Sequence, residues 1–344
     1  MRIIIIGFGI VGESFARILS EKEKDLVKNY GLRPDVVAVV DVKGAVVNLS
    51  GLRFEELYMS KRSCGSLALH PKFKSNMGGV EIIEKVDADV VVEATPTNVV
   101  DGEPGLSHIM AALKRKKHVV TSNKGPLALA LPALMELATY NKVFLRFSGT
   151  VGGGTPILDL GRRCLVGDRI ASFKGIFNGT TNYMLTRMDE AEVSMEEALR
   201  EAQQKGYAET DPSYDVKGID SACKLVITAN WVMGKSVTLR DVNVTGITGV
   251  TLNDVKRAKS EDRAIKLIAS AEGEELVVKP QLIPRRHPLC VDGALNAVSF
   301  MSEYAGEVTI VGKGAGGTET GGAILRDLID IRRGLAALGE EMKI

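Results

Sequence analysis

Short apolar runs rich in valine and isoleucine recur through the first half of the chain, and segments with helical periodicity separate them. Runs of this kind are typical of parallel strands that are covered by helices on both faces. The predicted strands are residues 2–6, 36–40, 89–94, 118–122 and 143–147. The alternation of strands and helices predicts a doubly wound α/β domain with a parallel sheet.

A glycine motif, GFGIVG, directly follows the first predicted strand and opens a helix. In this context Gly7 permits a tight turn, Gly9 lets the backbone approach a pyrophosphate, and Gly12 allows close packing of helix on strand. The anion then lies on unpaired N–H groups of the helix N-terminus. The motif predicts a Rossmann-type dinucleotide site formed by Gly7, Phe8, Gly9, Ile10, Val11 and Gly12.

Asp41 ends the second predicted strand, where an acidic residue can accept both ribose hydroxyls of NAD and repels a 2′-phosphate. Lys43 and the basic residues 61–62 can offset that repulsion, so the sequence leaves NAD or NADP open and slightly favours NAD. Thr95, at the end of the 89–94 strand, and Lys124, after the 118–122 strand, lie at the edge where a cofactor binds in such sheets.

The glycine-rich loop at residues 148–156 interrupts the regular alternation of strands and helices. The second half of the chain does not continue that alternation. We predict a dinucleotide-binding domain over 1–148, an α+β catalytic and dimerisation domain over 149–306, and a segment over 307–344 that returns to the first domain. Strands are expected at 170–177, 275–278, 297–301 and 307–311. Ser194 and Glu197 form a capping box for a helix that ends near residue 206.

Residues 215–233 predict a helix that is apolar almost all round, with Asp215 as its N-cap and Gly234 as its stop. From Gly218 to Met233 it carries only two charges, Asp220 and Lys224, which lie four apart and therefore on one face. Burying such a pair costs several kcal/mol unless other contacts compensate, so a functional role is favoured over a surface ion pair. Further carboxylates lie upstream at Glu209, Asp211 and Asp215.

Bulk composition narrows the class of protein. The 344 residues suffice for two domains, and 45% apolar with 25% charged residues is ordinary for a soluble globular protein. A formal net charge of +1 gives no electrostatic reason to expect a nucleic acid or membrane partner. The four cysteines lack metal-site spacing, and no segment has the length of a transmembrane helix, so we expect a cytoplasmic protein with free thiols.

Several motifs together resemble homoserine dehydrogenase. They are GFGIVG, TSNKGPLA (121–128), GTVGGGTPIL (149–158), IFNGTTNYML (176–185), GYAETDPSYDVKGIDSACKL (206–225) and GKGAGGTETGGA (312–323). The resemblance implies NAD(P)-dependent interconversion of L-homoserine and L-aspartate 4-semialdehyde, in threonine and methionine biosynthesis. It also implies a homodimer formed through the sheet of the second domain. Many members carry a C-terminal regulatory ACT domain, which we do not expect here.

The resemblance also assigns roles by position. Lys224 matches the catalytic proton donor and Lys124 a second active-site lysine, which also lies at the cofactor. Substrate ligands are implied at Glu209 and Asp220, to which we add the nearby Asp215, and cofactor contacts are implied at Thr95, Gly206 and Gly316. A possible sodium site would use the backbone oxygens of Val151, Gly153 and Thr155 with Ser148.

Two alternatives stay open. A related enzyme could reduce another semialdehyde or oxidise an amino acid on the same scaffold. A regulator that senses NAD(P) without chemistry would need the glycine motif but not the lysine and carboxylates of the 215–233 helix.

Overall fold

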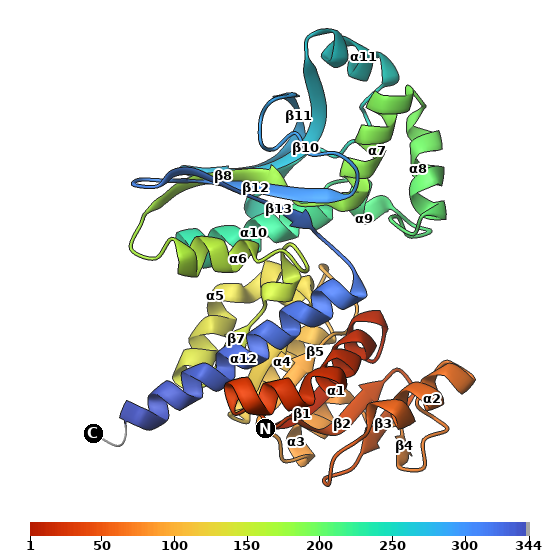
Figure 1. The fold of residues 1–344 in the computed structure, drawn as a ribbon, viewed down its shortest axis with the longest axis vertical. Coiled ribbons are helices and arrows are strands. Elements are labelled where there is room, and N and C mark those ends of the chain that lie inside the picture. The colour runs from red at the N-terminus through yellow and green to blue at the C-terminus, as the bar shows by residue number, and fades with distance from the viewer. Residues whose placement is uncertain (342–344) are drawn as a thin grey trace. The chain divides into compact units, whose positions relative to one another are not determined.

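The computed structural model describes residues 1–341, which form two compact units (Figure 1). The first unit comprises residues 1–150 together with the chain from Gly316 onward, and the second comprises Val151–Ala315. The predicted last segment, 307–344, is divided between them, because β13 (Gly306–Lys313) joins the sheet of the second unit and α12 (Gly317–Glu341) belongs to the first.

The first unit is built on a seven-stranded sheet with the order β4-β3-β2-β1-β5-β6-β7. Strands β2, β1, β5, β6 and β7 are parallel, while β3 and β4 add an antiparallel edge. The strands are β1 (Arg2–Ile6), β2 (Asp35–Asp41), β3 (Gly44–Val47), β4 (Phe73–Ser75), β5 (Val90–Glu93), β6 (His118–Thr121) and β7 (Leu145–Arg146). The order in which the strands are added reverses at β1: β2 lies on one side of it and β5 on the other. Ligands bind at such switch points in doubly wound folds.

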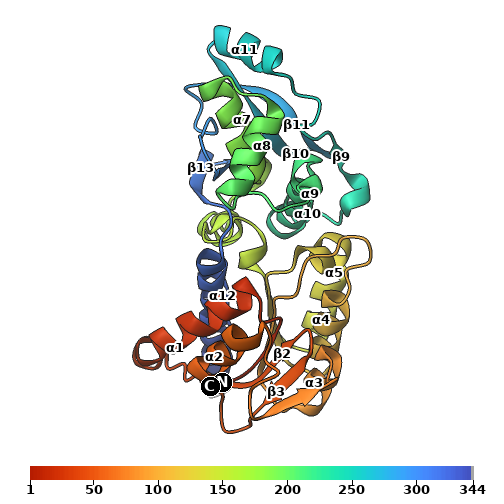
Figure 2. The same ribbon diagram turned by 90° about the vertical axis from the view of Figure 1, so that its right-hand side faces the viewer.

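Helices cover both faces of this sheet. Figure 2 shows α1 and α12 on one face, and α3, α4 and α5 on the other. The helices are α1 (Ile10–Tyr30), α2 (Phe54–Cys64), α3 (Gly79–Lys85), α4 (Gly105–Lys114), α5 (Lys124–Tyr140) and α12. The C-terminal helix completes the core, because Ile324, Leu328 and Ile331 are buried in the same cluster as Phe15 of α1 and Ile5 of β1.

The second unit has a six-stranded sheet with the order β13-β12-β8-β10-β11-β9, in which only the β9–β11 pair is parallel. Its strands are β8 (Ile170–Ile176), β9 (Asn243–Val244), β10 (Arg263–Glu272), β11 (Glu275–Pro284), β12 (Leu295–Ser302) and β13. Its helices are α6 (Ile157–Asp159), α7 (Gly179–Ala191), α8 (Met195–Gln204), α9 (Ser213–Val216), α10 (Ile219–Met233) and α11 (Leu252–Ser260). Helices α6 and α10 lie along one face of the sheet (Figure 1).

One predicted boundary is wrong. Asp215 does not cap the long apolar helix, because it lies inside the short helix α9 and α10 begins only at Ile219, after Gly218. Gly218 has a φ of 82°, which turns the chain sharply between the two helices and which a side-chain-bearing residue would adopt only with strain. The predicted end is confirmed, since Gly234 closes α10 in the left-handed conformation.

No helix within residues 1–341 is long and apolar enough to span a membrane.

Candidate active site

The glycine turn between β1 and α1 has the geometry that each of its glycines predicts. Gly7 has a φ of 94°, and a Cβ there would lie 2.5 Å from the carbonyl oxygen of Ala94. A Cβ on Gly12 would lie 2.0 Å from the carbonyl oxygen of Gly7, so only glycine lets the helix pack this closely. At Gly9 a Cβ would meet nothing within 4 Å. The turn therefore leaves open space at the one glycine expected to face a phosphate.

The first turn of α1 fits an anionic ligand. Its N-cap is Gly9, which has no side chain to bond the free N–H groups of that turn. Phe8 is buried and Val11 is half-buried, whereas Ile10 is 80% exposed. The residues present therefore fit a dinucleotide, with a backbone cradle for the pyrophosphate and apolar surface beside it.

Asp41 lies at the carboxyl end of β2, as predicted, and both of its carboxylate oxygens are engaged. Oδ1 accepts the N–H of Val42 at 2.9 Å, and Oδ2 accepts Nζ of Lys61 from α2 at 2.7 Å. The side chain of Asp41 is 6% exposed and that of Lys61 is 20% exposed. Lys43 is exposed at the turn that follows. Lys61 thus offsets part of the repulsion between this acid and a 2′-phosphate.

The carboxyl ends of β5 and β6 bring Thr95 and Asn123 together. Nδ2 of Asn123 donates to Oγ1 of Thr95 at 3.2 Å, and Oδ1 of Asn123 accepts the N–H of Gly125 at 3.1 Å. Asn123 is therefore the N-cap of α5, and Lys124 is the first residue of that helix. Thr95 is adjacent to the glycine turn, since a Cβ on Gly7 would lie 2.9 Å from its backbone nitrogen.

Lys224 and Asp220 form a buried ion pair on α10, each 6% exposed as a residue. Nζ of Lys224 lies 2.7 Å from Oδ2 of Asp220 and donates to the carbonyl oxygen of Phe177 at 2.6 Å. An ammonium has three N–H donors, and no other residue in the described chain accepts the third. The predicted pair is thus present and buried, and one N–H of the Lys224 ammonium has no acceptor among the described residues.

Asn178 connects this pair to a second carboxylate. Its Nδ2 donates to Oδ2 of Asp220 at 2.9 Å and to Oδ1 of Asp215 at 2.6 Å. Its Oδ1 caps α7 by accepting the N–H of Thr181 at 2.8 Å, which fixes the orientation of the amide. Burial raises the pKa of Asp215 above its ordinary value, and the nearby charge of Asp220 adds to that effect.

Three other predicted site residues lie on loops or at a helix start. Glu209 is exposed, and its carbonyl oxygen accepts Nε2 of Gln203 at 3.1 Å. Gly206 has a φ of 74° with open space around a Cβ. Gly316, in the first unit, has a φ of 130° and directly precedes α12.

The sodium site stays a prediction of the resemblance. In the first unit, the N–H and Oγ of Ser148 donate to the two carboxylate oxygens of Asp327, at 2.8 and 2.6 Å. In the second, Oγ1 of Thr155 donates to the carbonyl oxygen of Lys313 at 3.0 Å. Val151 is buried there, and Gly153 has a left-handed φ of 51°.

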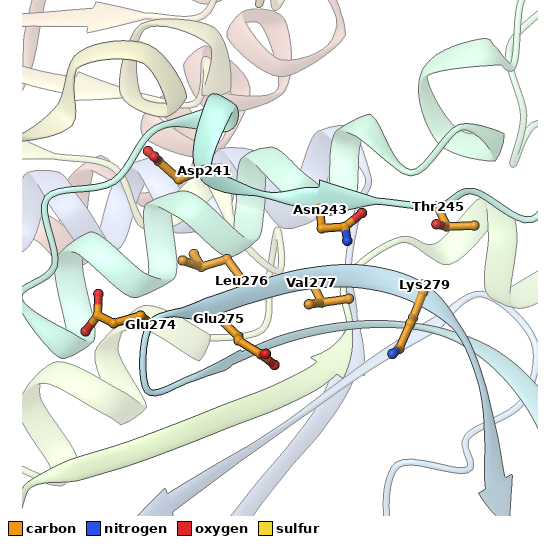
Figure 3. Close-up of a pocket in the computed structure, with 8 residues that line it drawn as sticks. All are labelled: Asp241, Asn243, Thr245, Glu274, Glu275, Leu276, Val277 and Lys279. Atoms are coloured by element: carbon orange, nitrogen blue, oxygen red, sulfur yellow. The ribbon is translucent and has the colours of Figure 1, made fainter.

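A surface depression in the second unit is not part of this chemistry. It lies where β9 pairs with the start of β11 (Figure 3). None of the predicted site residues lines it; the lining residues are Asp241, Asn243, Thr245, Glu274, Glu275, Leu276, Val277 and Lys279.

Comparison with known proteins gives the family. The model of the homoserine dehydrogenase NAD-binding domain matches residues 7–148, and the homoserine dehydrogenase model matches residues 156–329. The chain belongs to the homoserine dehydrogenase family. The predicted family, Rossmann-type fold class and enzyme class, an NAD(P)-dependent oxidoreductase acting on CH–OH groups, are confirmed.

Relatives resemble the chain along its length. A homoserine dehydrogenase of Methanocaldococcus jannaschii is 44% identical over 331 residues, which cover 96% of this chain and 98% of that protein. An NAD(+)-dependent homoserine dehydrogenase of Pseudomonas canavaninivorans is 40% identical over 339 residues, 96% of each chain. The solved structure of a hyperthermophilic archaeal homoserine dehydrogenase in complex with NADPH superposes with a TM-score of 0.83 at 30% identity, covering 96% of this chain and 97% of that one.

Sequence reasoning missed Asn178, the residue that joins the carboxylates. The signal was present, since an asparagine before Gly-Thr-Thr marks a helix N-cap, but a cap uses only the side-chain oxygen. That both amide hydrogens reach carboxylates more than thirty residues away depends on the fold.

Proposed function

We propose that the chain catalyses the NAD(P)-dependent interconversion of L-homoserine and L-aspartate 4-semialdehyde, in amino-acid biosynthesis. The observation that carries this proposal is the buried ammonium of Lys224, fixed by Asp220 and the carbonyl of Phe177 with one N–H to spare. A rigid donor of this kind stabilises negative charge that develops on a substrate oxygen.

The charges around Lys224 favour an amino-acid substrate. Two carboxylates, Asp215 and Asp220, and one ammonium leave an excess of one negative charge in a largely buried site. An amino-acid ammonium compensates that excess, which burial makes costly to leave unpaired. We therefore infer that Asp215 and Asp220, with Glu209 from the neighbouring loop, bind the amino group and hydroxyl of homoserine.

The proton steps follow from this arrangement. A bound nicotinamide cofactor supplies the hydride for reduction and accepts it in oxidation. During reduction the aldehyde oxygen gains negative charge, and the ammonium of Lys224 donates a proton to it. In the reverse direction the neutral amine of Lys224 removes the hydroxyl proton. Asp220 holds Nζ in place throughout, so little reorganisation accompanies the transfer.

Other predicted residues complete the proposed machinery. Lys124, at the first position of α5, orients or polarises the reacting end of the substrate. Thr95, Gly206 and Gly316 contact the cofactor together with the glycine turn, for which Gly9 offers open space. A monovalent cation on the 148–155 loop would stabilise the loop and take no part in the chemistry. Comparison of activity in sodium and potassium salts tests whether such a cation is needed.

We infer a preference for NAD over NADP. The support is the carboxylate of Asp41 at the end of β2, where ribose hydroxyls bind in this fold. Its contact with Lys61 lessens the penalty for a 2′-phosphate, so the preference should be moderate. The replacement Asp41→Asn removes the negative charge and should raise kcat/KM for NADP relative to NAD.

We also propose a homodimer formed through the second sheet. Met301 and Val311 are 42% and 46% exposed. They share a face of the sheet, because Ala297 pairs with Val311 and lies four residues before Met301. The adjacent Phe300 faces the other way, toward the α10 side, where it lies with Val232 around Gly161. Two copies of this face would bury the exposed apolar side chains.

The direct test is absorbance at 340 nm with L-homoserine and either NAD⁺ or NADP⁺. The proposal predicts NADH or NADPH formation with homoserine, and much less with aspartate or with amino acids that lack a side-chain hydroxyl. Activity on another amino acid in place of homoserine would favour the related-dehydrogenase alternative. Cofactor binding without turnover of any of these substrates would favour the sensing regulator.

A further inference from the structure

The strand ends of the first unit contain a buried carboxylate to which the proposed mechanism gives no role. Glu93, the last residue of β5, is 0% exposed. Its acceptors are met mainly by neutral donors: Thr95 through its N–H at 3.1 Å and its hydroxyl, and Thr121 through its hydroxyl at 3.1 Å. Nδ1 of His108 is 3.7 Å away and makes no hydrogen bond in the described chain. A carboxylate buried with so little countercharge is expensive, so a purely structural role explains it poorly.

The hydrogen bonds around Glu93 form two arms that both start at Asn123. In one arm the N–H of Asn123 donates to Oγ1 of Thr121 at 3.0 Å, and that hydroxyl donates to Oε2 of Glu93. In the other, Nδ2 of Asn123 donates to Oγ1 of Thr95 at 3.2 Å, and that hydroxyl donates to Oε1 of Glu93. An ionised carboxylate only accepts, so both hydroxyls must point toward it and every donor direction is fixed.

Both arms connect Glu93 to Asn123, the N-cap of α5, where the candidate site begins. Asn123 caps α5 by accepting the N–H of Gly125, and Lys124 is the residue between them. The side chain of Asn123 has little freedom to shift, because a Cβ on Gly105 of α4 would lie 2.5 Å from its Nδ2. The orientation of the α5 N-terminus therefore depends on the ordered hydrogen bonds that converge on Glu93.

We propose that Glu93 is a positioning residue that fixes Lys124, and with it Thr95, through the two threonine arms. This inference rests on the proposed function, in which Lys124 acts on the substrate. The replacement Glu93→Gln keeps the size of the side chain but puts an amide donor where one threonine hydroxyl must donate. One arm then loses its order, and Lys124 loses its fixed position.

A double-mutant cycle tests the proposal. Glu93→Gln should lower kcat/KM for homoserine about tenfold or more, since small misplacements of a catalytic group have effects up to about a hundredfold. In a Lys124→Met background the same replacement should have little further effect, because the group that it positions is already absent. The matched control Glu103→Gln, which removes a carboxylate that also accepts a serine hydroxyl, should leave kcat/KM unchanged. The dissociation constant of NADH, from fluorescence titration, should rise several-fold in Glu93→Gln through Thr95 and stay constant in Glu103→Gln.

Each outcome decides the question. Equal losses of kcat/KM in the wild-type and Lys124→Met backgrounds, or no loss in either, would overturn the inference. If Glu93→Gln does not fold, Thr121→Val breaks the Thr121 arm alone, and the same double-mutant cycle applies to it. Absence of homoserine turnover in the unmodified chain would instead refute the proposed function, so the two failures are distinguishable.

Discussion

At the scale of single residues, the acidic side of the proposed site depends on one amide. Asn178 donates to both Asp215 and Asp220, and burial together with the charge of Asp220 raises the pKa of Asp215. A carboxyl group with a raised pKa takes up a proton at a higher pH than an ordinary aspartate, whose value is 3.8. A substrate ammonium favours the charged form, so binding and deprotonation of Asp215 are linked.

We predict that KM for homoserine rises as the pH falls toward the raised pKa of Asp215, because the neutral acid cannot hold an ammonium. Asp215→Asn should have a KM at least about tenfold higher at neutral pH, in line with about 1.5–3 kcal/mol for a charged hydrogen bond, and should flatten this acid limb. Steady-state kinetics across pH measures both effects. The control is Asp211→Asn, which changes an exposed carboxylate in the loop just before α9; a wild-type KM in Asp215→Asn would refute the assignment.

His118 gives a separate prediction about stability. Its Nδ1 accepts the N–H of Phe144 at 3.0 Å, and burial lowers its pKa below the ordinary 6.5. The unfolded chain therefore binds a proton more readily than the folded one, so this part of the stability is complete above about pH 6.5 and is lost as pH falls below it. The urea midpoint should decline between pH 7.5 and 5, and less so in His118→Asn, which keeps an acceptor without titrating. Identical declines in both proteins would exclude His118 as the cause.

Several residues of the site could be predicted from the chain because their signals are local. Lys224 and Asp220 are the only charges in an apolar helix, and burial of both follows from that pattern. Glu93 and Asn178 could not be predicted in the same way. Their importance depends on partners from other elements, Thr121 for Glu93 and Asp220 for Asn178, and nothing near them in the sequence indicates those partners.

At the scale of elements, two glycines in the turn between β1 and α1 should respond differently to replacement by alanine, so each serves as a control for the other. Gly9→Ala should leave the melting temperature nearly unchanged, since its Cβ meets nothing within 4 Å, but should raise the cofactor dissociation constant about tenfold or more. Gly12→Ala should destabilise the fold by about 1–3 kcal/mol, the usual range for overpacking, because its Cβ would lie 2.0 Å from the Gly7 carbonyl oxygen. Thermal denaturation and fluorescence titration separate the two. Unaltered cofactor binding in a folded Gly9→Ala protein would show that the open space is not the phosphate position.

Elements with strong local signals were predicted well. The capping box of Ser194 and Glu197 at the start of α8 is confirmed, as is the strand ahead of the glycine turn. Strand β10 was missed because it carries charged Lys266 at a position that is 1% exposed in the fold. There the ammonium is bonded to Asn182, Thr186 and the carbonyl oxygen of Val291, so long-range contacts offset a charge that argues locally against a buried strand.

At the scale of the whole molecule, the proposed homodimer predicts that charge on one face of the second sheet prevents association. Met301→Lys combined with Val311→Lys should shift the protein from dimer to monomer in sedimentation velocity. Leu282→Lys is the control. Leu282 is 44% exposed, but it lies on the other face of that sheet, where it pairs with Ile265 across β10 and β11. A dimer that survives the double replacement would place the interface elsewhere.

The assignment of segments to the two units was only partly predictable. A glycine-rich stretch marks each passage of the chain between units, at Thr150–Val151 and at Ala315–Gly316. The segment predicted to return to the first unit begins at residue 307 and so includes nearly all of β13. An apolar strand pattern does not reveal which sheet the strand will join. The antiparallel pairing of β13 with β12, along eight residue pairs, decides that.

The most direct test of the account is the turnover of Lys224→Ala with L-homoserine. We predict that kcat falls at least about a hundredfold, as expected on loss of a general acid, while the NADH dissociation constant changes by less than about twofold. Lys217→Ala, an exposed lysine in the same region, should retain wild-type turnover. A folded Lys224→Ala protein whose kcat lies within a few fold of wild type would contradict the central claim that this ammonium is the proton donor.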